Sequence, residues 1–308
     1  MADRVSRQAQ IRGNLKIRAA LYRAVRIFFE QEGFLEVEVP CRVPCPLPEA
    51  NVDAVESGEW FLQASPESCM KRLLAAGYPR IFTIHRAFRK GERGGRHLPE
   101  FSLLEWYRAE AGYTALMDDC ERLVAFIAKS LGAENSLVYG DFRVDLKRPW
   151  PRLSVSDAFA RYAQKSAGQA VTDGSFDYDM AFAVEPALDP SRPVFLCDYP
   201  KEKASLARIS TNNTLVAERF ELYAAGLEIA NGFSELNDAE EQRRRFADEE
   251  KDRRAAGKPP YPAPEKFLED LSRMPPAAGI ALGLDRLVML FADAREIDEV
   301  TAFTPEEL

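Results

Sequence analysis

Cysteine and histidine are both scarce in this chain of 308 residues, which contains five cysteines and two histidines. An odd number of cysteines without regular spacing does not form a disulfide framework, so we expect reduced thiols. With so few histidines in the chain, the closely spaced Cys41 and Cys45 do not predict a zinc site. No apolar run approaches the ~20 residues of a membrane span, and Met1–Arg4 begins no apolar signal region. These absences predict a cytoplasmic protein without a membrane partner.

Positive charge is also in deficit, because 41 lysines and arginines face 49 aspartates and glutamates and give a formal net charge of -8. Such a balance argues against a protein whose main role is to coat a nucleic-acid backbone, although it allows a local basic patch. Hydrophobic residues make up 46% of the chain, which is enough for a large core. The length allows one large domain or two smaller ones, and no linker or repeat favours the second possibility.

The stretch from Ala277 to Phe291 is the one around which the chain is organised. Small and alternating apolar residues up to Leu282 predict a buried strand, and from Gly283 the apolar residues follow helical spacing. Free N–H groups at the start of such a helix attract an anion. Arg286 lies in the first turn of this helix, where a charged side chain gains no hydrophobic stabilisation from burial. The stretch predicts a guanidinium held against phosphate or stacked on a ring, with a surface arginine after an ordinary turn as the alternative.

Near the N-terminus, an amphipathic helix over Leu15–Gln31 is predicted to end at Gly33 and to lead into a strand over Leu35–Pro40. The proline must close that strand or lie at a sheet edge. The unit is either a packing unit of functional importance or an ordinary helix-to-strand corner.

Residues 41–60 are rich in proline, glutamate and asparagine and predict a loop, which is followed by a strand over Trp60–Ala64. The next residues predict a helix start, with Ser65 as the N-cap and Pro66 at the first helical position. Glu67 would then face whatever lies above the sheet, or would only complement the helix dipole.

A hairpin with a positively charged tip is predicted between residues 80 and 108, where two strands flank a glycine-rich loop. Clustered cations in an acidic protein favour a polyphosphate site because they focus the local field. The alternative is a solvated hairpin. The cations are Arg86, Arg89, Lys90, Arg93 and Arg96.

The returning strand of this hairpin is predicted to form one wall of a pocket. A period of two places Phe101, Leu103, Glu105 and Tyr107 on one face of the strand. A carboxylate, a phenol and an aromatic ring on one face can hold an amine.

A second hairpin is predicted over Glu218–Glu235, with its turn near Ala224. That turn would make Glu221 and Glu228 cross-strand partners, which repel each other unless a cation lies between them. Paired carboxylates suit magnesium held together with substrate phosphates, and the alternative is two exposed glutamates on different faces. Residues 133–200, with weaker patterns of short strands and helices, predict an insertion or cap.

These segments, in this order, resemble the motifs of the class II aminoacyl-tRNA synthetases, from about residue 14 to the C-terminus. The helix, strand and Pro40 resemble the first motif, Phe88–Tyr107 the second and Gly279–Arg286 the third. The run Leu227–Glu240 is similar to the lysine-specific subclass. The resemblance implies an α+β fold, with an antiparallel sheet flanked by helices, in a single catalytic domain that dimerises through residues 14–40.

A narrower resemblance is to the free-standing lysyl-tRNA synthetase paralogues that attach (R)-β-lysine to a lysine of elongation factor P. Pro99–Phe101 and Leu104–Arg108 are similar to this group, and the chain begins at the catalytic core with no room for an anticodon-binding domain. Ala281 stands where tRNA-charging relatives generally have glycine. The resemblance therefore implies lysine or (R)-β-lysine as substrate and elongation factor P as partner, with tRNA disfavoured.

The resemblance also implies a role for each matching residue, with ATP and magnesium bound at one end of the site. Arg89 and Arg286 would be catalytic, Arg89 on the α-phosphate and Arg286 with Phe101 around the adenine. Glu221 and Glu228 would hold magnesium. The implied ATP-binding residues are Arg89, Lys90, Glu92, His97, Phe101, Glu228, Ile229, Gly283 and Arg286. The implied amino-acid pocket consists of Ser65, Glu67, Glu105, Tyr107, Asn231, Phe233, Glu235 and Ala281.

Two positions depart from the family pattern. Gly91 replaces a usual glutamate, so Glu92 would take its role, and Leu98 replaces an asparagine that contacts ATP. The implied chemistry is formation of an aminoacyl-adenylate and transfer to a protein lysine. The alternatives are a truncated lysyl-tRNA synthetase that charges tRNA and a regulatory paralogue without activity.

Overall fold

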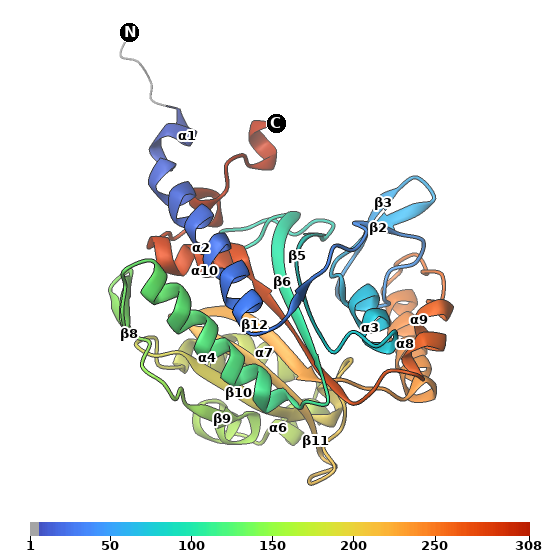
Figure 1. Ribbon diagram of the computed structural model, residues 1–308. Coiled ribbons are helices and arrows are strands. Elements are labelled where there is room, and N and C mark those ends of the chain that lie inside the picture. Colours follow the sequence, from blue (N-terminus) through green and yellow to red (C-terminus); the bar gives the residue numbers. More distant parts are fainter. Residues whose placement is uncertain (1–5) are drawn as a thin grey trace.

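An eight-stranded, mostly antiparallel sheet runs through the centre of the protein (Figure 1). In this computed structural model, which describes residues 6–308, the strand order is β1-β5-β6-β13-β12-β11-β10-β9. Among the described strands of this sheet, the two pairs at its edges, β1 with β5 and β9 with β10, are parallel. The predicted α+β class is confirmed. The bounds are Leu35–Glu36 (β1), Arg80–Phe88 (β5), Glu100–Ala109 (β6), Ala277–Gly283 (β13), Leu227–Ser234 (β12), Val216–Ala224 (β11), Val194–Pro200 (β10) and Arg152–Ser154 (β9).

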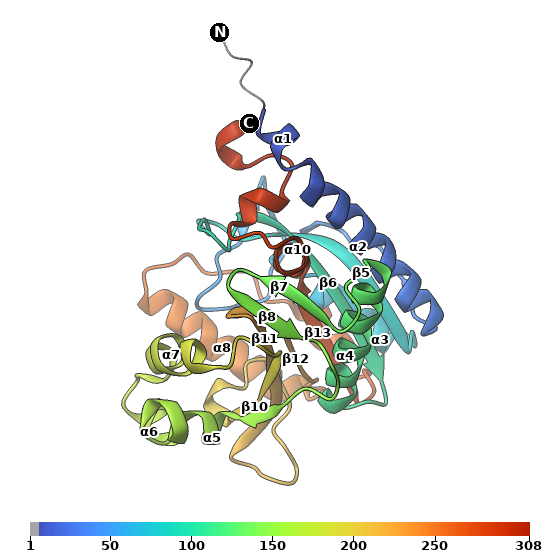
Figure 2. The same cartoon turned by 90° about the vertical axis from the view of Figure 1, so that its left-hand side faces the viewer.

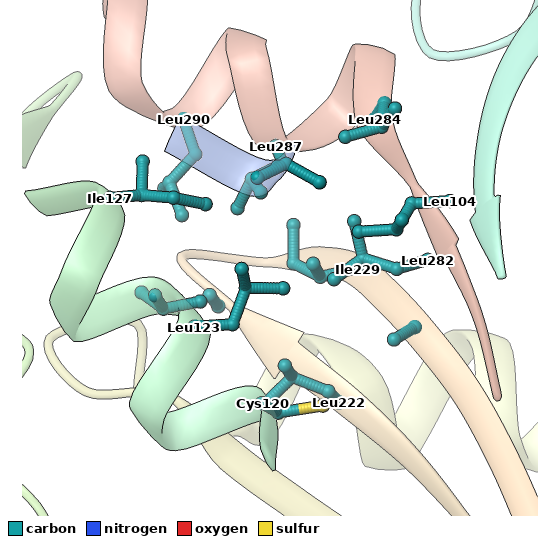
Figure 3. Close-up of a cluster of buried hydrophobic side chains, with 14 of the residues drawn as sticks. Leu104, Cys120, Leu123, Ile127, Leu222, Ile229, Leu282, Leu284, Leu287 and Leu290 are labelled. Atoms are coloured by element: carbon teal, nitrogen blue, oxygen red, sulfur yellow. The ribbon is translucent and has the colours of Figure 1, made fainter. Parts of the chain in front are cut away.

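Three helices cover one face of the sheet and enclose the main hydrophobic core. They are α2 (Arg12–Gln31), α4 (Tyr113–Ser130) and α10 (Leu284–Ala292). Apolar residues three and four positions apart give each helix one buried stripe, and these stripes meet over the sheet. Figure 3 shows this contact, in which Leu123 and Ile127 of α4 face Leu287 and Leu290 of α10.

The opposite face carries α3 (Glu67–Ala75), α8 (Ala239–Ala255) and α9 (Glu265–Leu271), which gather at the other side of the sheet in Figure 1. Because side chains alternate along a strand, β6 directs Leu104 and Trp106 into the main core and the alternate residues Leu103, Glu105 and Tyr107 toward this second face. The predicted common face of Phe101, Leu103, Glu105 and Tyr107 is confirmed, since all four line one cavity.

The segment between β1 and α3 differs from the prediction. The expected strand over Leu35–Pro40 is paired only at β1, and the expected loop over residues 41–60 contains strands. Strands β2 (Arg42–Val43), β3 (Val55–Ser57) and β4 (Trp60–Leu62) form a separate small sheet in the order β2-β4-β3. Strands of two or three residues are too short to produce an alternating pattern that could be recognised in the sequence.

Residues 133–200 are partly integral to the main sheet. Strands β7 (Ser136–Tyr139) and β8 (Phe142–Asp145) form a hairpin of their own, whereas β9 and β10 complete one edge of the central sheet. The short helices α5 (Val155–Ala158), α6 (Ala167–Thr172) and α7 (Phe176–Asp179) form a second core with β10 and Tyr223 of β11.

The described ends of the chain lie close together at one end of the molecule (Figures 1 and 2). Arg7, the first residue of α1 (Arg7–Gln10), forms an ion pair with Glu307 and donates to the Ala302 carbonyl at 2.9 Å. The same C-terminal segment binds Arg93 of the β5–β6 loop through Asp298 at 2.8 Å. Within residues 6–308, no helix combines the length and apolar character needed to cross a lipid bilayer.

Candidate active site

A cavity of about 300 Å³ lies on the second face of the sheet, over β6, β12 and β13. It brings together residues that are far apart in the sequence, and most of the predicted site residues line it. Those in the lining are Ser65, Glu67, Arg89, Glu92, His97, Phe101, Glu105, Tyr107, Glu228, Ile229, Asn231, Phe233, Ala281, Gly283 and Arg286. Lys90, Glu221 and Glu235 are outside the lining.

Glu105 is the central acid at one end of the cavity. Its Oε1 accepts a hydrogen bond from the Ser65 hydroxyl at 2.7 Å, and its Oε2 accepts one from the Tyr107 hydroxyl at 2.8 Å. The residue is 1% exposed, and burial raises the pKa of its carboxyl to about 8. A buried acid that readily holds a proton is suited to become ionised when an ammonium group arrives.

Ser65 also orients the start of α3, although not as the predicted N-cap. The helix begins at Glu67 with Pro66 as the cap residue. The Ser65 hydroxyl accepts the Glu67 N–H at 3.1 Å. One hydroxyl therefore links Glu67 to Glu105, and both acids line the cavity.

Lys71, which the sequence analysis missed, lies among these acids. Its ammonium is 2.5 Å from Glu67 Oε1 and 2.6 Å from Glu235 Oε2, and its side chain is 1% exposed. Burial alone would lower the pKa of Lys71, but the charges of Glu235 and Glu67 outweigh burial, and the pKa is raised. The spacing of four residues between Glu67 and Lys71 is the signal that could have identified this pair.

Glu235 is fully buried outside the cavity lining, next to the lining residue Gly279. Burial raises the pKa of its carboxyl to about 8, while the charge of Lys71 opposes this. A Cβ atom at Gly279 would lie 2.3 Å from Glu235 Oε1 and 2.2 Å from the Tyr107 ring, so glycine is required there. The next inward residue of β13, Ala281, is paired with Glu105 on β6 and Asn231 on β12.

The other end of the cavity is cationic and aromatic. Arg286 donates to the Glu228 carbonyl at 2.8 Å and lies 3.1 Å from Glu228 Oε2. Its Nη2 lies 2.7 Å from His97 Nε2. Burial lowers the pKa of His97 and the charge of Arg286 lowers it further, so a neutral ring can accept this hydrogen bond. Arg89 stacks over the Phe101 ring at 5.1 Å.

The cations of the predicted hairpin tip lie in two different environments, the cavity and the C-terminal segment. Arg89 and Arg96 line the cavity, and Arg89 lies 3.6 Å from Glu92. Arg93 instead forms ion pairs with Asp298 and Glu306, at 2.8 Å each. Lys90, predicted for ATP, remains outside the cavity lining.

The register predicted for the second hairpin is wrong. Glu221 is opposite Asn231, and Glu228 is opposite Tyr223. The turn lies at Ala225–Gly226, one residue later than predicted, and an irregularity between Leu222 and Tyr223 shifts the pairing by one further residue. The two acids nevertheless interact. Burial and then the charge of Glu221 raise the pKa of Glu228.

Glu221 is already hydrogen-bonded, with Oε1 accepting from Arg219 Nη2 and Oε2 from the Tyr223 hydroxyl, both at 2.7 Å. Glu185, from the segment with no assigned role, is a third acid nearby, since burial and the charges of Glu221 and Glu228 raise its pKa. Within the described part of the chain, no group of three or more His, Cys, Asp or Glu side chains is arranged to hold a metal ion. The donor chemistry of Glu221 and Glu228 thus fits magnesium only as an ion shared with phosphate oxygens.

Glu49 is a further cavity residue that the sequence analysis did not identify. Burial raises the pKa of its carboxyl to about 7. Its loop is anchored to α8 by Arg253, which is 1% exposed and donates to the Glu49 carbonyl at 3.0 Å and to Asp53 Oδ1 at 2.9 Å. No local pattern marks this position, since its placement depends on a helix some 200 residues later.

A buried ion pair joins the first and third motifs behind the site. Arg18 of α2 lies 2.5 Å from Asp285 Oδ1, and Asp285 Oδ2 accepts the Ser102 N–H of β6 at 2.7 Å. Because Asp285 directly precedes Arg286, the pair fixes the turn of α10 that presents Arg286 to the cavity.

One cavity that is acidic at one end and rich in arginine at the other, on a mostly antiparallel sheet, is the arrangement expected of a class II synthetase core. Residues 3–307 match the family model of the class II tRNA synthetases (D, K and N), and the chain belongs to this family. It is 38% identical to the elongation factor P–(R)-β-lysine ligase of Enterobacter sp. (strain 638) and 39% identical to that of Edwardsiella ictaluri (strain 93-146), each over 94% of both chains.

Proposed function

We propose that the protein is an ATP-dependent ligase that activates (R)-β-lysine or lysine and transfers it to a lysine side chain of elongation factor P. The observation that carries the proposal is the single cavity with buried acids at one end and arginines with an aromatic ring at the other. The names of the two relatives support elongation factor P as the acceptor.

In the first step, a carboxylate oxygen of the amino acid attacks the α-phosphorus of ATP, an aminoacyl-adenylate forms and pyrophosphate leaves. Arg89 would neutralise the α-phosphate, while Phe101 and Arg286 would hold the adenine between them. The stacking of Arg89 on Phe101 and the fixed position of Arg286 support these roles. Positioning and charge neutralisation are sufficient for this chemistry, so no covalent enzyme nucleophile is required.

In the second step, the acceptor amine attacks the acyl carbon of the adenylate, an amide forms, and AMP leaves together with a proton from the amine. The amino-acid ammonium groups would be held by Glu67, Glu105 and Glu235. The raised carboxyl pKa values of Glu105 and Glu235 support this assignment, because such groups are stabilised in their ionised form by a cation.

Magnesium is part of the proposal as an ion held by Glu221 and Glu228 together with ATP phosphates. When bound, it would neutralise phosphate charge in the first step. The mutual repulsion of the two acids supports this role, since a cation between them would relieve it. Of the two, Glu228 is the more available ligand because only Glu221 has both oxygens occupied by hydrogen bonds from Arg219 and Tyr223.

We further propose one catalytic domain per chain, a cytoplasmic location and a homodimer through residues 14–40. Two large hydrophobic side chains on this segment are exposed, Ile27 at 38% and Leu35 at 50%, which supports an interface there. Sedimentation of the wild-type protein beside an Ile27→Glu variant tests the dimer, and a wild-type monomer contradicts it.

The test of function is ATP–pyrophosphate exchange with a panel of amino acids, followed by transfer of labelled amino acid to elongation factor P or to bulk tRNA. We expect exchange with (R)-β-lysine and labelling of the protein acceptor. Robust labelling of tRNA would favour a lysyl-tRNA synthetase, and no exchange with any amino acid would favour a regulatory paralogue.

A further inference from the structure

Behind the amino-acid end of the cavity, outside its lining, lies a buried lysine that contacts the lining residues Glu67 and Phe233 and that the proposed chemistry leaves without a role. We propose that Lys71 is a positioning residue that sets the charge of this pocket, so that the pocket accepts an amino acid with two ammonium groups. The inference rests on the proposed function, because it concerns the substrate of the same site.

The geometry of Lys71 holds two acids at fixed positions. Its ammonium lies between Glu67, one helical turn earlier on α3, and Glu235, which follows β12. It also lies 5.3 Å from the centre of the Phe233 ring, which lines the cavity. The side chain is 1% exposed, so no water layer weakens these contacts.

Glu235 is confined from both sides as a result. One of its oxygens is 2.6 Å from the Lys71 ammonium, and the other occupies the space left by the missing side chain of Gly279. An acid held in this way cannot rotate to follow a ligand. A cationic group that enters the pocket must therefore fit the acids as Lys71 has placed them.

The charges of this pocket match a diamine. Glu67, Glu105 and Glu235 supply up to three negative charges, and Lys71 supplies one positive charge. Two negative charges then remain for the substrate, which equals the charge of two ammonium groups. Without Lys71, the pocket would hold one acid in excess, and that acid would keep a proton because like charges at close range do not both ionise.

A structural role is the competing explanation, in which the ion pairs only fix α3 on the sheet. The two explanations differ in what they predict for pH dependence. A purely structural lysine affects stability and leaves the ionisation of the substrate-bound acids unchanged, whereas a charge-setting lysine lowers the pH at which those acids ionise.

The experiment compares wild type, Lys71→Met, Lys71→Arg and the control Arg72→Met in pyrophosphate exchange with lysine or (R)-β-lysine between pH 6 and 9. Arg72 is on the same helix, and its ion pair with Asp270 is outside the cavity. In Lys71→Met we expect KM to rise about tenfold or more at neutral pH with little change in kcat, because an ion-pair contact of the pocket is lost. In a plot of kcat/KM against pH, the fall on the acidic side should occur at a pH about one unit higher, because the positive charge that favours ionisation of the nearby acids is removed.

Lys71→Arg retains the charge, so its acidic limb should stay at the wild-type position even if KM rises. Arg72→Met should resemble wild type in both measurements. An unchanged KM and pH profile in Lys71→Met overturns the inference. If Lys71→Met does not fold, the pH profile of Lys71→Arg is the test. An acidic limb of kcat/KM that is shifted from the wild-type position in Lys71→Arg also overturns the inference.

The same data separate this inference from the proposed function. If wild type shows no exchange with any diamino acid, the proposed function fails and the inference fails with it. If wild type is active and only the expected effects of Lys71 are missing, the inference alone is wrong.

Discussion

Arg286 shows how a single residue is positioned by groups far away in the sequence. The sequence places it one turn into a helix, but the carbonyl of Glu228 and the ring of His97 fix its guanidinium. The buried contact of Arg18 with Asp285 supports the same turn from the opposite side of the sheet. A residue held by three elements is pre-organised, as we propose for the arginine that contacts ATP.

Replacing Arg286 is expected to reduce adenylate formation strongly while the protein remains folded. A hydrogen bond to a charged group contributes about 1.5–3 kcal/mol, so Arg286→Ala should reduce exchange activity roughly 10- to 150-fold or more. Pyrophosphate exchange and thermal melting are measured together, with Arg143→Ala on the separate β7–β8 hairpin as a control. Unchanged exchange kinetics in Arg286→Ala would remove it from the ATP site.

Ala281 is the residue on which we propose that the preference for the amino acid depends. Its neighbours across the sheet are Glu105 and Asn231, so its methyl group borders the pocket directly. We expect Ala281→Gly to enlarge the pocket and shift preference toward α-lysine by ~1–3 kcal/mol, about 10- to 200-fold in relative kcat/KM. The measurement is the ratio of exchange rates with (R)-β-lysine and α-lysine.

Glycine at position 281 would also loosen β13, at a cost of ~0.5–1 kcal/mol of stability, so melting temperatures accompany the rates. An unchanged ratio in a folded variant would exclude the methyl group as a source of specificity.

At the scale of elements, the β11–β12 hairpin determines whether two acids can share a cation. The position of its turn places Glu228 opposite Tyr223, and a one-residue irregularity beyond that pair places Glu221 opposite Asn231. The acids are therefore neighbours on one face without being direct partners. Hydrogen bonds from Arg219 and Tyr223 further distinguish Glu221 from Glu228.

This asymmetry predicts unequal effects on magnesium dependence. Glu228→Gln should raise the magnesium concentration needed for half-maximal exchange more than Glu221→Gln does, because the Glu221 carboxylate is already engaged. Magnesium titrations of the exchange rate test this, with Glu218→Gln as a control whose ion pair with Arg208 lies outside the cavity. Equal magnesium requirements in wild type and Glu228→Gln would contradict the assignment.

At the scale of the whole molecule, buried acids link stability to pH. The folded-state pKa of Glu105 and Glu235 is raised to about 8 and that of Glu49 to about 7. The folded protein therefore holds more protons at these groups than the unfolded chain does. Their contribution to stability is fully present below the unfolded-state pKa of ~4.3 and is lost as the pH rises through about 8.

We expect the melting temperature to fall between pH 6 and pH 9, and lysine to stabilise the protein more at pH 8 than at pH 6, because ionised acids bind its ammonium groups better. Glu105→Gln retains a group that can bond to Ser65 and Tyr107 but does not titrate, so its melting temperature should depend less on pH. Thermal melts with and without lysine test this, and a wild-type melting temperature that rises over this range would contradict it.

The sequence by itself determined the elements that depend on local periodicity. The strand-to-helix switch at Gly283, the β5–β6 hairpin and the cavity face of β6 follow from side-chain alternation and helical spacing, which are properties of neighbouring residues. Most residues implied for the ATP and amino-acid pockets also line the cavity, since those motifs lie on these elements.

The tertiary structure alone decided what depends on contacts between distant segments. Lys71 joins Glu67 to Glu235, Arg253 holds the loop of Glu49, and Arg93 binds the C-terminal segment instead of facing the cavity. The register of β11 and β12 depends on the exact position of the turn and on one extra residue, and no hydrophobic pattern marks either of them. Ionised and hydrogen-bonding side chains choose their partners among all groups that packing brings near, so their pairing is fixed only when the sheet and its helices have assembled.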